Sequence, residues 1–309
     1  MAHTELAVVT GAFGYTGRHV AKRLLDLGVR VRTITRRQDG AIPLGGRVEV
    51  APANFSNPDR LRRSLEGADV LYNTYWVRFA RGQTTFDRAV ANSEALFTAA
   101  AQAGVGKIVH FSVTNAASDS RLPYFKGKGQ VEEALRRVGV PYAILRPTLV
   151  FGEGDILVNN IAWALRRFPV FPVYGGGDYP VQPVFAGDLA EQAVAAGSQS
   201  GSSVSDAAGP DKTSFKALLR LLTAAFGVRS RLVHTPPTVG YALTALVGLL
   251  KRDVVLTRDE IAGLMAGLLT SDAPPTGTTK LSSWLDRNAD GLGRQYVSEL
   301  RRNWRPFGR

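Results

Sequence analysis

The chain has 309 residues, of which 45% are hydrophobic and 21% charged, and its formal net charge is +12. It contains no cysteine, which excludes disulfides, thiolate zinc sites and cysteine nucleophiles, and its four histidines are scattered without the spacing of metal ligands. We therefore expect no metal site and no Ser-His-Asp machinery. This length holds one large α/β domain, or a nucleotide-binding domain with a smaller appendage.

The sequence also bears on location and partners. A strand-like run begins almost at once, at Leu6, and the longest apolar stretch, residues 239–250, is too short to span a bilayer. We expect a soluble, cytoplasmic protein. Its basic residues are spread along the chain without a recognition motif, so nucleic acid is not an expected partner. Ordinary solvated surface is the main explanation for the basic excess, and an anionic membrane surface is the alternative.

The first half of the chain alternates short β-type runs with amphipathic helical stretches. The expected strands are residues 6–10, 29–37, 47–55, 68–76, 107–113 and 141–147. The expected helices between them are residues 14–28, 59–67, 86–104 and about 121–138. This alternation predicts an α/β fold, a Rossmann-type doubly wound parallel sheet.

The alternation breaks after Gly152. Residues 152–185 are rich in glycine and proline around one short helix, residues 186–210 return to a helix and a strand-like run, and the remainder is mainly helical. We expect a Rossmann domain of residues 1–150 plus about 181–210, and a smaller substrate or cap region of residues 151–180 and 211–309. Within that region, residues 237–269 read as two largely apolar helices that cap the substrate site, form a homo-oligomer interface or rest on a membrane surface.

A glycine-rich turn follows the first expected strand. Gly11 permits a sharp turn, Gly14 lets the backbone approach a pyrophosphate, and Gly17 lets the next helix pack close to the strand. The helix N-terminus contributes NH groups and a dipole that favour negative charge. The alternative is a tight turn without a ligand. We expect the molecule that carries this pyrophosphate to contact three residues between the glycines as well: Phe13, Tyr15 and Thr16.

The spacing G-x-x-G-x-x-G resembles the short-chain dehydrogenase/reductase superfamily in its extended and atypical branches, and the resemblance covers residues 5 to about 195. The second strand ends in Arg36 and Arg37, with no acid until Asp39. A carboxylate at this point would bind the adenosine ribose and repel a 2′-phosphate, whereas guanidinium groups bind phosphate. NADP(H) is therefore favoured over NAD(H), and solvated strand-end charges are the alternative explanation of the arginines.

The resemblance assigns further cofactor contacts. Asn54, followed by Phe55, stands where the family usually has an acidic residue against the adenine, and Asn73 and Thr74 close the fourth strand beneath the adenosine ribose. The segment 143–155 resembles the family's L-R-P segment, which implies that three residues pass near the nicotinamide: Pro147, Thr148 and Val150.

Tyr124 and Lys128 are four residues apart at the start of an expected helix and so share one face. Alone, this spacing is equally typical of a tyrosine that packs on a lysine stem. Its place after a strand that ends in FSVT resembles the superfamily's Tyr-x-x-x-Lys pair. In that pair the phenol transfers a proton, and the lysine stabilises the phenolate and can also hydrogen-bond the nicotinamide ribose of the cofactor. A hydroxyl at the strand end would orient the substrate oxygen. Alignment points to Thr114, and Ser112 keeps the literal serine.

These features predict an NADP(H)-dependent oxidoreductase that transfers hydride to or from a carbonyl or related unsaturated group of a small, moderately apolar substrate. Tyr124 comes only twelve positions after Ser112, a short connection similar to that of a complex I accessory subunit and of NmrA-like sensors. A non-catalytic NADP(H)-binding sensor or assembly subunit is therefore the rival hypothesis. An epimerase or isomerase with a retained cofactor is the third.

Overall fold

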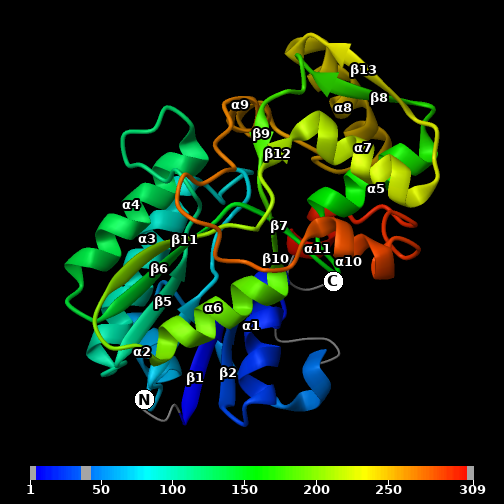
Figure 1. Ribbon diagram of the computed structural model, residues 1–309. Helices are drawn as coiled ribbons and strands as arrows, with labels where there is room; N and C mark the ends of the chain where they lie inside the picture. Colours follow the sequence, from blue (N-terminus) through cyan, green and yellow to red (C-terminus); the bar gives the residue numbers. More distant parts are fainter. Residues whose placement is uncertain (1–4, 36–42, 305–309) are drawn as a thin grey trace. The chain divides into compact units, whose positions relative to one another are not determined.

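The computed structural model describes residues 5–35 and 43–304 (Figure 1). The chain forms two compact units. The first unit comprises Met1–Pro147 and Ala186–Ala207, and the second comprises Thr148–Phe185 and Ala208–Arg309. The short strand β7 (Leu149–Phe151) pairs in parallel with β10 (Pro183–Phe185), so both strands belong to the second unit. The chain thus leaves the first unit directly after Pro147.

The first unit is built on a seven-stranded sheet, in which all the strand pairs between described residues are parallel. The strand order is β11-β6-β5-β4-β1-β2-β3, which contains the Rossmann order of two mononucleotide-binding halves. The doubly wound fold is therefore confirmed. The strands are β1 (Leu6–Thr10), β2 (Arg30–Thr35), β3 (Val48–Pro52), β4 (Val70–Asn73), β5 (Lys107–Phe111), β6 (Tyr142–Pro147) and β11 (Ser203–Ala207).

Helices cover both faces of this sheet (Figure 1). They are α1 (Tyr15–Asp26), α2 (Pro58–Leu65), α3 (Phe86–Gln102), α4 (Pro123–Arg137) and α6 (Ala186–Ser198), with a 3-10 turn, η1, at Pro43–Gly46. Helices α1 and α6 pack together, and α2, α3 and α4 pack side by side. Leu61 of α2, Leu96 of α3 and Leu135 of α4 are fully buried in one apolar core with the strands. The helical periodicity of the sequence therefore places each apolar face against the sheet.

Strand β4 is shorter than the sequence suggests, and the reason lies at the candidate site. The expected strand of residues 68–76 ends at Asn73, because the backbone NH groups of Thr74 and Tyr75 both donate to the Thr10 hydroxyl, at 2.8 and 3.1 Å. These bonds replace ladder bonds and turn the chain out of the sheet at its carboxyl edge. Parallel α/β sheets bind ligands at this edge.

The second unit combines helices with short strand pairs. Its further strands are β8 (Val170–Tyr174), β9 (Pro180–Val181), β12 (Thr213–Ser214) and β13 (Arg231–Thr235), paired β8 with β13 and β9 with β12. Its helices are α5 (Leu157–Arg167), α7 (Phe215–Phe226), α8 (Pro237–Lys251), α9 (Arg258–Met265), α10 (Leu281–Asn288) and α11 (Glu299–Asn303). An apolar core around Phe151, Leu219 and Trp284 holds this unit together.

Two features of the described residues bear on the function class. No helix in residues 5–35 and 43–304 has both the length and the apolar character needed to cross a membrane. The same residues hold no group of three or more histidine or acidic side chains arranged to take a metal ion.

Candidate functional site

The glycine turn between β1 and α1 closes on itself through its backbone. Gly11 has a φ of +67°, a conformation that favours glycine, and the NH of Gly14 donates to the Gly11 carbonyl at 2.7 Å. A Cβ atom at position 17 would lie 2.2 Å from that same carbonyl oxygen. Gly17 is therefore required for α1 to start this close to the end of β1.

The turn fits the pyrophosphate of a dinucleotide. Gly14 occupies the N-cap position of α1 and has no side chain to cover the first NH groups of the helix, and the first turn carries no acidic residue. Uncapped NH groups and the positive end of the helix dipole form an anion site. Half-buried side chains surround the turn: Phe13, Tyr15 and Thr16. The ring of Tyr15 lies against that of His19, with centroids 5.4 Å apart.

The carboxyl ends of β1, β4 and β5 are joined by buried polar side chains. Asn73 accepts a hydrogen bond from the Thr10 hydroxyl at 3.1 Å, and its amide nitrogen donates to Nδ1 of His110 at 3.1 Å. Burial and the nearby Lys128 hold the pKa of His110 well below its usual range, so the imidazole is neutral and accepts this bond. Thr74 donates its hydroxyl to the Thr10 carbonyl. These residues form a rigid floor at the strand ends.

The residues assigned to adenine follow β3. Asn54 is half-buried, and its side-chain oxygen accepts a hydrogen bond from the Ser56 hydroxyl at 2.9 Å. The ring of Phe55 packs on that of Tyr75, with centroids 5.0 Å apart, and the amide of Asn92 donates to the Tyr75 hydroxyl at 2.8 Å. Helix α3 thereby fixes an aromatic pair beside the position that the resemblance gives to adenine.

Tyr124 and Lys128 meet the same aromatic ring. Lys128 Nζ lies 4.7 Å from the ring centroid of Trp76, and the ring of Tyr124 stands edge-on to Trp76 at 6.1 Å. The ring of Phe86 stacks on Trp76 and stands edge-on to Tyr124. Gly127 makes this packing possible, because a Cβ atom there would lie 2.9 Å from the indole. The two polar residues therefore share one aromatic wall.

Lys128 is buried deeply for a lysine. It is 4% exposed, and its ammonium group donates to the Phe111 carbonyl at the end of β5 at 2.6 Å. Burial lowers the pKa of Lys128 to about 7, and Glu132 partly opposes this effect. The side chain therefore changes its charge close to neutral pH, as a group that assists proton transfer requires.

The two hydroxyls at the end of β5 have different surroundings. The Ser112 hydroxyl donates to the buried carboxylate of Glu132 at 2.6 Å. That carboxylate also accepts from the guanidinium of Arg146, at 2.6 and 2.8 Å. Thr114 is buried, and its side-chain oxygen accepts a bond from the Asn115 amide at 3.3 Å. Ser112 is thus committed to an internal ionic cluster.

Sequence reasoning missed Glu132. Its position in the run VEEAL looks like a solvated helix face. The available signal is its helical spacing from Lys128 and Leu135, which places all three residues on the face of α4 that the structure buries.

The remaining predicted site residues lie partly outside the described residues, partly in the first unit and partly in the second. Arg36 and Arg37 lie outside the described residues. Pro147 ends β6 in the first unit, and its carbonyl accepts the NH of Thr114 at 3.0 Å. Thr148 and Val150 belong to the second unit, where Val150 pairs with Val184.

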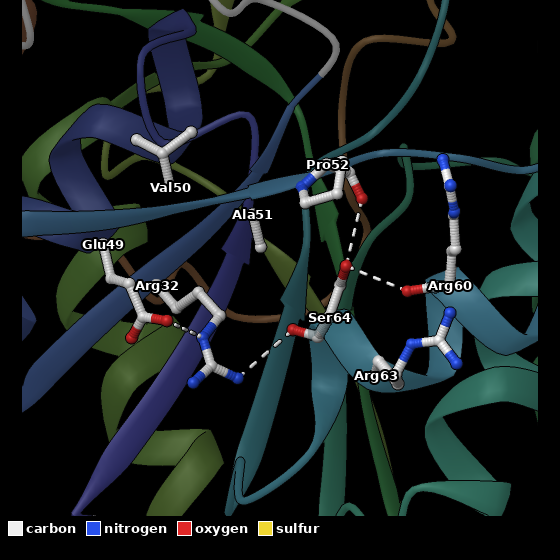
Figure 2. Close-up of a pocket in the computed structure, with 8 residues that line it drawn as sticks. All are labelled: Arg32, Glu49, Val50, Ala51, Pro52, Arg60, Arg63 and Ser64. Atoms are coloured by element: carbon white, nitrogen blue, oxygen red, sulfur yellow. Dashed lines mark hydrogen bonds and ion pairs between the residues drawn. The ribbon is translucent and has the colours of Figure 1, made fainter.

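A pocket of about 400 Å³ opens at the β3 edge of the sheet, and Figure 2 shows its lining. The lining residues are Arg32, Glu49, Val50, Ala51, Pro52, Arg60, Arg63 and Ser64. Arg32 donates to the Glu49 carboxylate at 2.8 Å and to the Ser64 carbonyl at 3.3 Å. This arginine therefore holds β2, β3 and α2 together. None of the predicted site residues that the structure describes lines the pocket.

Comparison with known proteins agrees with this geometry. Residues 11–156 match the model of a family described as NAD(P)H-binding. The chain is 24% identical over 287 residues to NADH dehydrogenase (ubiquinone) 1 alpha subcomplex subunit 9, mitochondrial, of Arabidopsis thaliana, covering 86% of this chain and 71% of that protein. It is 31% identical over 194 residues to the (4-alkanoyl-5-oxo-2,5-dihydrofuran-3-yl)methyl phosphate reductase of Streptomyces griseus, covering 62% of each chain.

A solved structure shows the same fold. The triphenylmethane reductase of Citrobacter sp., complexed with NADP(H), superimposes with a TM-score of 0.75 at 20% identity, covering 91% of this chain and 98% of that one. The first unit thus has a Rossmann-type fold, and the residues that match the NAD(P)H-binding family include most of it. The resemblance to the extended and atypical branches of the short-chain dehydrogenase/reductase superfamily is confirmed. The expected nicotinamide cofactor is confirmed at the level of NAD(P)H.

Proposed function

We propose that this chain is an NADPH-dependent oxidoreductase that reduces a carbonyl or related unsaturated group of a small, moderately apolar molecule. The observation that carries the proposal is the convergence of Tyr124 and Lys128 on the Trp76 ring. A phenol and a lysine whose pKa is about 7 lie one helical turn apart beside the carboxyl edge of the sheet. This combination can supply a proton at neutral pH.

Each residue then has a defined task. The glycine turn binds the pyrophosphate, and the floor made by Thr10, Asn73 and Thr74 supports the adenosine ribose. The reduced nicotinamide, when bound, supplies the hydride. Tyr124 donates its proton to the substrate oxygen, and the Lys128 ammonium stabilises the phenolate that remains. The product is the alcohol, with hydrogen added at carbon and at oxygen.

We assign the orientation of the substrate oxygen to Thr114 rather than Ser112. A hydroxyl that donates to a buried carboxylate at 2.6 Å is not available to a substrate without the loss of a charge-assisted bond. The proposal therefore gives Ser112 a structural task, which is to satisfy Glu132. Thr114 is buried at the corresponding strand end, and it is also the residue to which the resemblance points.

The comparisons support the oxidoreductase class. The Streptomyces griseus relative and the Citrobacter structure are both named as reductases. Preference for NADPH over NADH rests on Arg36 and Arg37 and stays a prediction. A titration with each cofactor checks it, and tighter binding of NADH would end it.

A second candidate function is a non-catalytic NAD(P)H-binding subunit. Two observations favour it: Lys128 donates to the Phe111 carbonyl within the protein, and the Arabidopsis thaliana relative is named as a subunit of a larger dehydrogenase. An epimerase or isomerase would instead retain its cofactor, which would then co-purify with the chain.

The replacement Tyr124→Phe tests the proposed function. NADPH oxidation is measured with a panel of aldehydes, ketones and quinones. Loss of the proton donor should lower kcat by about 10²–10⁴-fold, while NADPH binding stays unchanged. Tyr142→Phe, at the amino end of β6, is the matched control and should keep full activity. Equal activity of wild type and Tyr124→Phe would overturn the catalytic assignment. NADPH binding with no turnover of any substrate in the panel would favour the second candidate.

A further inference from the structure

Helix α8 of the second unit is packed by its small residues. Its buried positions are Gly240, Thr244 and Gly248, each four residues from the next. A Cβ atom at position 240 would lie 2.6 Å from the ring of Tyr174, and the Thr244 hydroxyl lies 2.6 Å from the Tyr174 hydroxyl. A Cβ atom at 248 would lie 2.7 Å from the Asp253 carbonyl oxygen. The stripe of small residues therefore faces the protein, and α8 sits close against β8.

The opposite side of α8 is apolar and exposed. Val239, Leu243, Leu246 and Leu250 follow one another at intervals of four, three and four residues, so they form one stripe along the helix. They are 48%, 44%, 54% and 75% exposed, and the adjacent Leu249 is 75% exposed. A helix of a water-soluble protein normally buries such a stripe. We call these five residues the α8 face.

The neighbouring strand pair extends this apolar surface. Val170 of β8 and Val233 of β13 are 46% and 42% exposed. Because side chains alternate along a strand, Val170 lies on the same face of the pair as Tyr174, against which α8 packs. With Phe168, these residues and the α8 face make up eight of the eleven large apolar side chains that are exposed in the described chain. Figure 1 shows α8, β8 and β13 together in the second unit.

Positive charge borders the α8 face. Lys251 and Arg252 at the end of α8 are exposed, as are Arg231, the first residue of β13, and Arg229 just before that strand. None of the four forms an ion pair with another described residue. The Lys251 ammonium lies 4.7 Å from the ring centroid of Trp163. The nearby Asp253 is directed inward and accepts bonds from the Tyr296 hydroxyl and the start of α11. The border is therefore basic.

We propose that the α8 face docks on the surface of an anionic lipid bilayer, with α8 parallel to the membrane plane. Apolar side chains bordered by lysine, arginine and aromatic rings suit the boundary between acyl chains and anionic headgroups. The docking is peripheral, because within the described residues no helix is long and apolar enough to span a membrane.

A second copy of the chain is a weaker fit for the same surface. Helices that pair with each other carry charged residues beside the apolar stripe, and these charges set the register and the partner. Helix α8 has no charged residue before Lys251, so nothing along its length selects a partner helix. Lipid tails require no register. The proposal also explains part of the +12 net charge that cofactor binding leaves unexplained.

Co-sedimentation with vesicles tests the proposal. The vesicles are phosphatidylcholine alone, or phosphatidylcholine mixed with phosphatidylglycerol, at low and at high salt. We expect the wild-type protein to sediment with the anionic vesicles at low salt, and less at high salt because screening weakens the contribution of the basic border. The double variant Leu249→Gln, Leu250→Gln should lower the partition coefficient at least about tenfold, since two leucines no longer enter the lipid.

Three controls complete the test. Leu27→Gln changes an exposed leucine outside the second unit and should bind vesicles as the wild type does. Arg229→Ser, Arg231→Ser should lose the preference for anionic lipid. NADPH binding and thermal unfolding show that each variant is folded. Failure of the wild type to bind anionic vesicles would overturn the proposal, as would equal binding by the leucine variant. A dimer in solution that the leucine variant abolishes, without vesicle binding, would assign the α8 face to a second copy instead.

Discussion

The two halves of the candidate site, both in the first unit, are built in opposite ways. The glycine turn works through side chains that are missing: a Cβ atom at position 17 would lie 2.2 Å from the Gly11 carbonyl oxygen. The Tyr124–Lys128 pair works through a large side chain that is present, because both residues pack on the Trp76 ring. One half is defined by the backbone and the other by tertiary packing.

The difference teaches which part of a site a single sequence reveals. A missing side chain is a local constraint, so three glycines after a buried strand indicate a phosphate turn by themselves. A shared aromatic wall joins residues about fifty positions apart in the sequence, and no local pattern specifies it. Substitutions in the two halves should therefore change cofactor binding and proton transfer separately.

In the backbone half of the site, the largest effect is expected from Gly17→Ala, which adds one methyl group to the turn. The new Cβ atom forces α1 away from Gly11, which should destabilise the fold by about 1–3 kcal/mol. It also displaces the NH groups at the start of α1, so the affinity for NADPH should fall roughly a hundredfold. Urea unfolding and NADPH titration measure the two effects.

Gly291→Ala is the control for this substitution, because a Cβ atom there meets nothing closer than 3.9 Å. We expect it to leave both quantities unchanged. If Gly17→Ala retains wild-type affinity for NADPH, the turn does not hold the pyrophosphate, and the backbone half of the comparison fails.

A smaller and more selective effect separates the two hydroxyls at the end of β5. Thr114→Val should lower kcat by up to about a hundredfold and leave NADPH affinity unchanged, because it removes a group that orients the substrate oxygen. Ser112→Ala should leave kcat unchanged but cost about 1–3 kcal/mol of stability, since Glu132 loses a buried donor. The reverse pattern, with Ser112→Ala inactive and Thr114→Val active, would exchange the two assignments.

Much of the fold followed from the sequence, for identifiable reasons. Buried strands such as residues 6–10 and apolar helix faces such as that of α3 recur with the periods that the sheet and its covering helices require. The length of β4 could not be read in this way, because bonds from Thr74 and Tyr75 to the distant Thr10 end it.

The site followed in part. The spacing of Tyr124 and Lys128 could be recognised in the sequence. The choice between Ser112 and Thr114 could not, because it depends on Glu132, which reaches the end of β5 only through the packing of α4. Glycine weakens a helix interior, yet Gly127 and Gly129 both lie within α4. The structure gives each a steric reason, since Cβ atoms there would lie 2.9 Å from Trp76 and 2.4 Å from the backbone of Ala117. In α8, the apolar residues could be recognised in the sequence, but the sequence did not reveal that the small residues face inward.

The most gradual effect is the change of folding stability with pH that the charge of Lys128 causes. Its pKa is about 7 in the folded protein, below the ordinary value of 10.5, because burial penalises the ammonium form. Between these two values the unfolded chain holds a proton that the folded chain has released, so stability rises with pH by at most about 1.4 kcal/mol per unit. Below pH 7 both states are protonated, and the contribution is constant.

Replacement of Lys128 by methionine removes the titrating group but keeps much of the side-chain volume. The difference in unfolding free energy between wild type and Lys128→Met should therefore grow in favour of the wild type as pH rises from about 7 toward about 10.5. Urea unfolding at a series of pH values measures it. Lys126→Met, an exposed neighbour on the same helix, should give a curve parallel to that of the wild type. A parallel curve for Lys128→Met as well would mean that the ammonium is not penalised in the folded protein. The pKa of Lys128 would then not lie near neutral pH. In that case Tyr124 and Lys128 would hold the cofactor without assisting proton transfer.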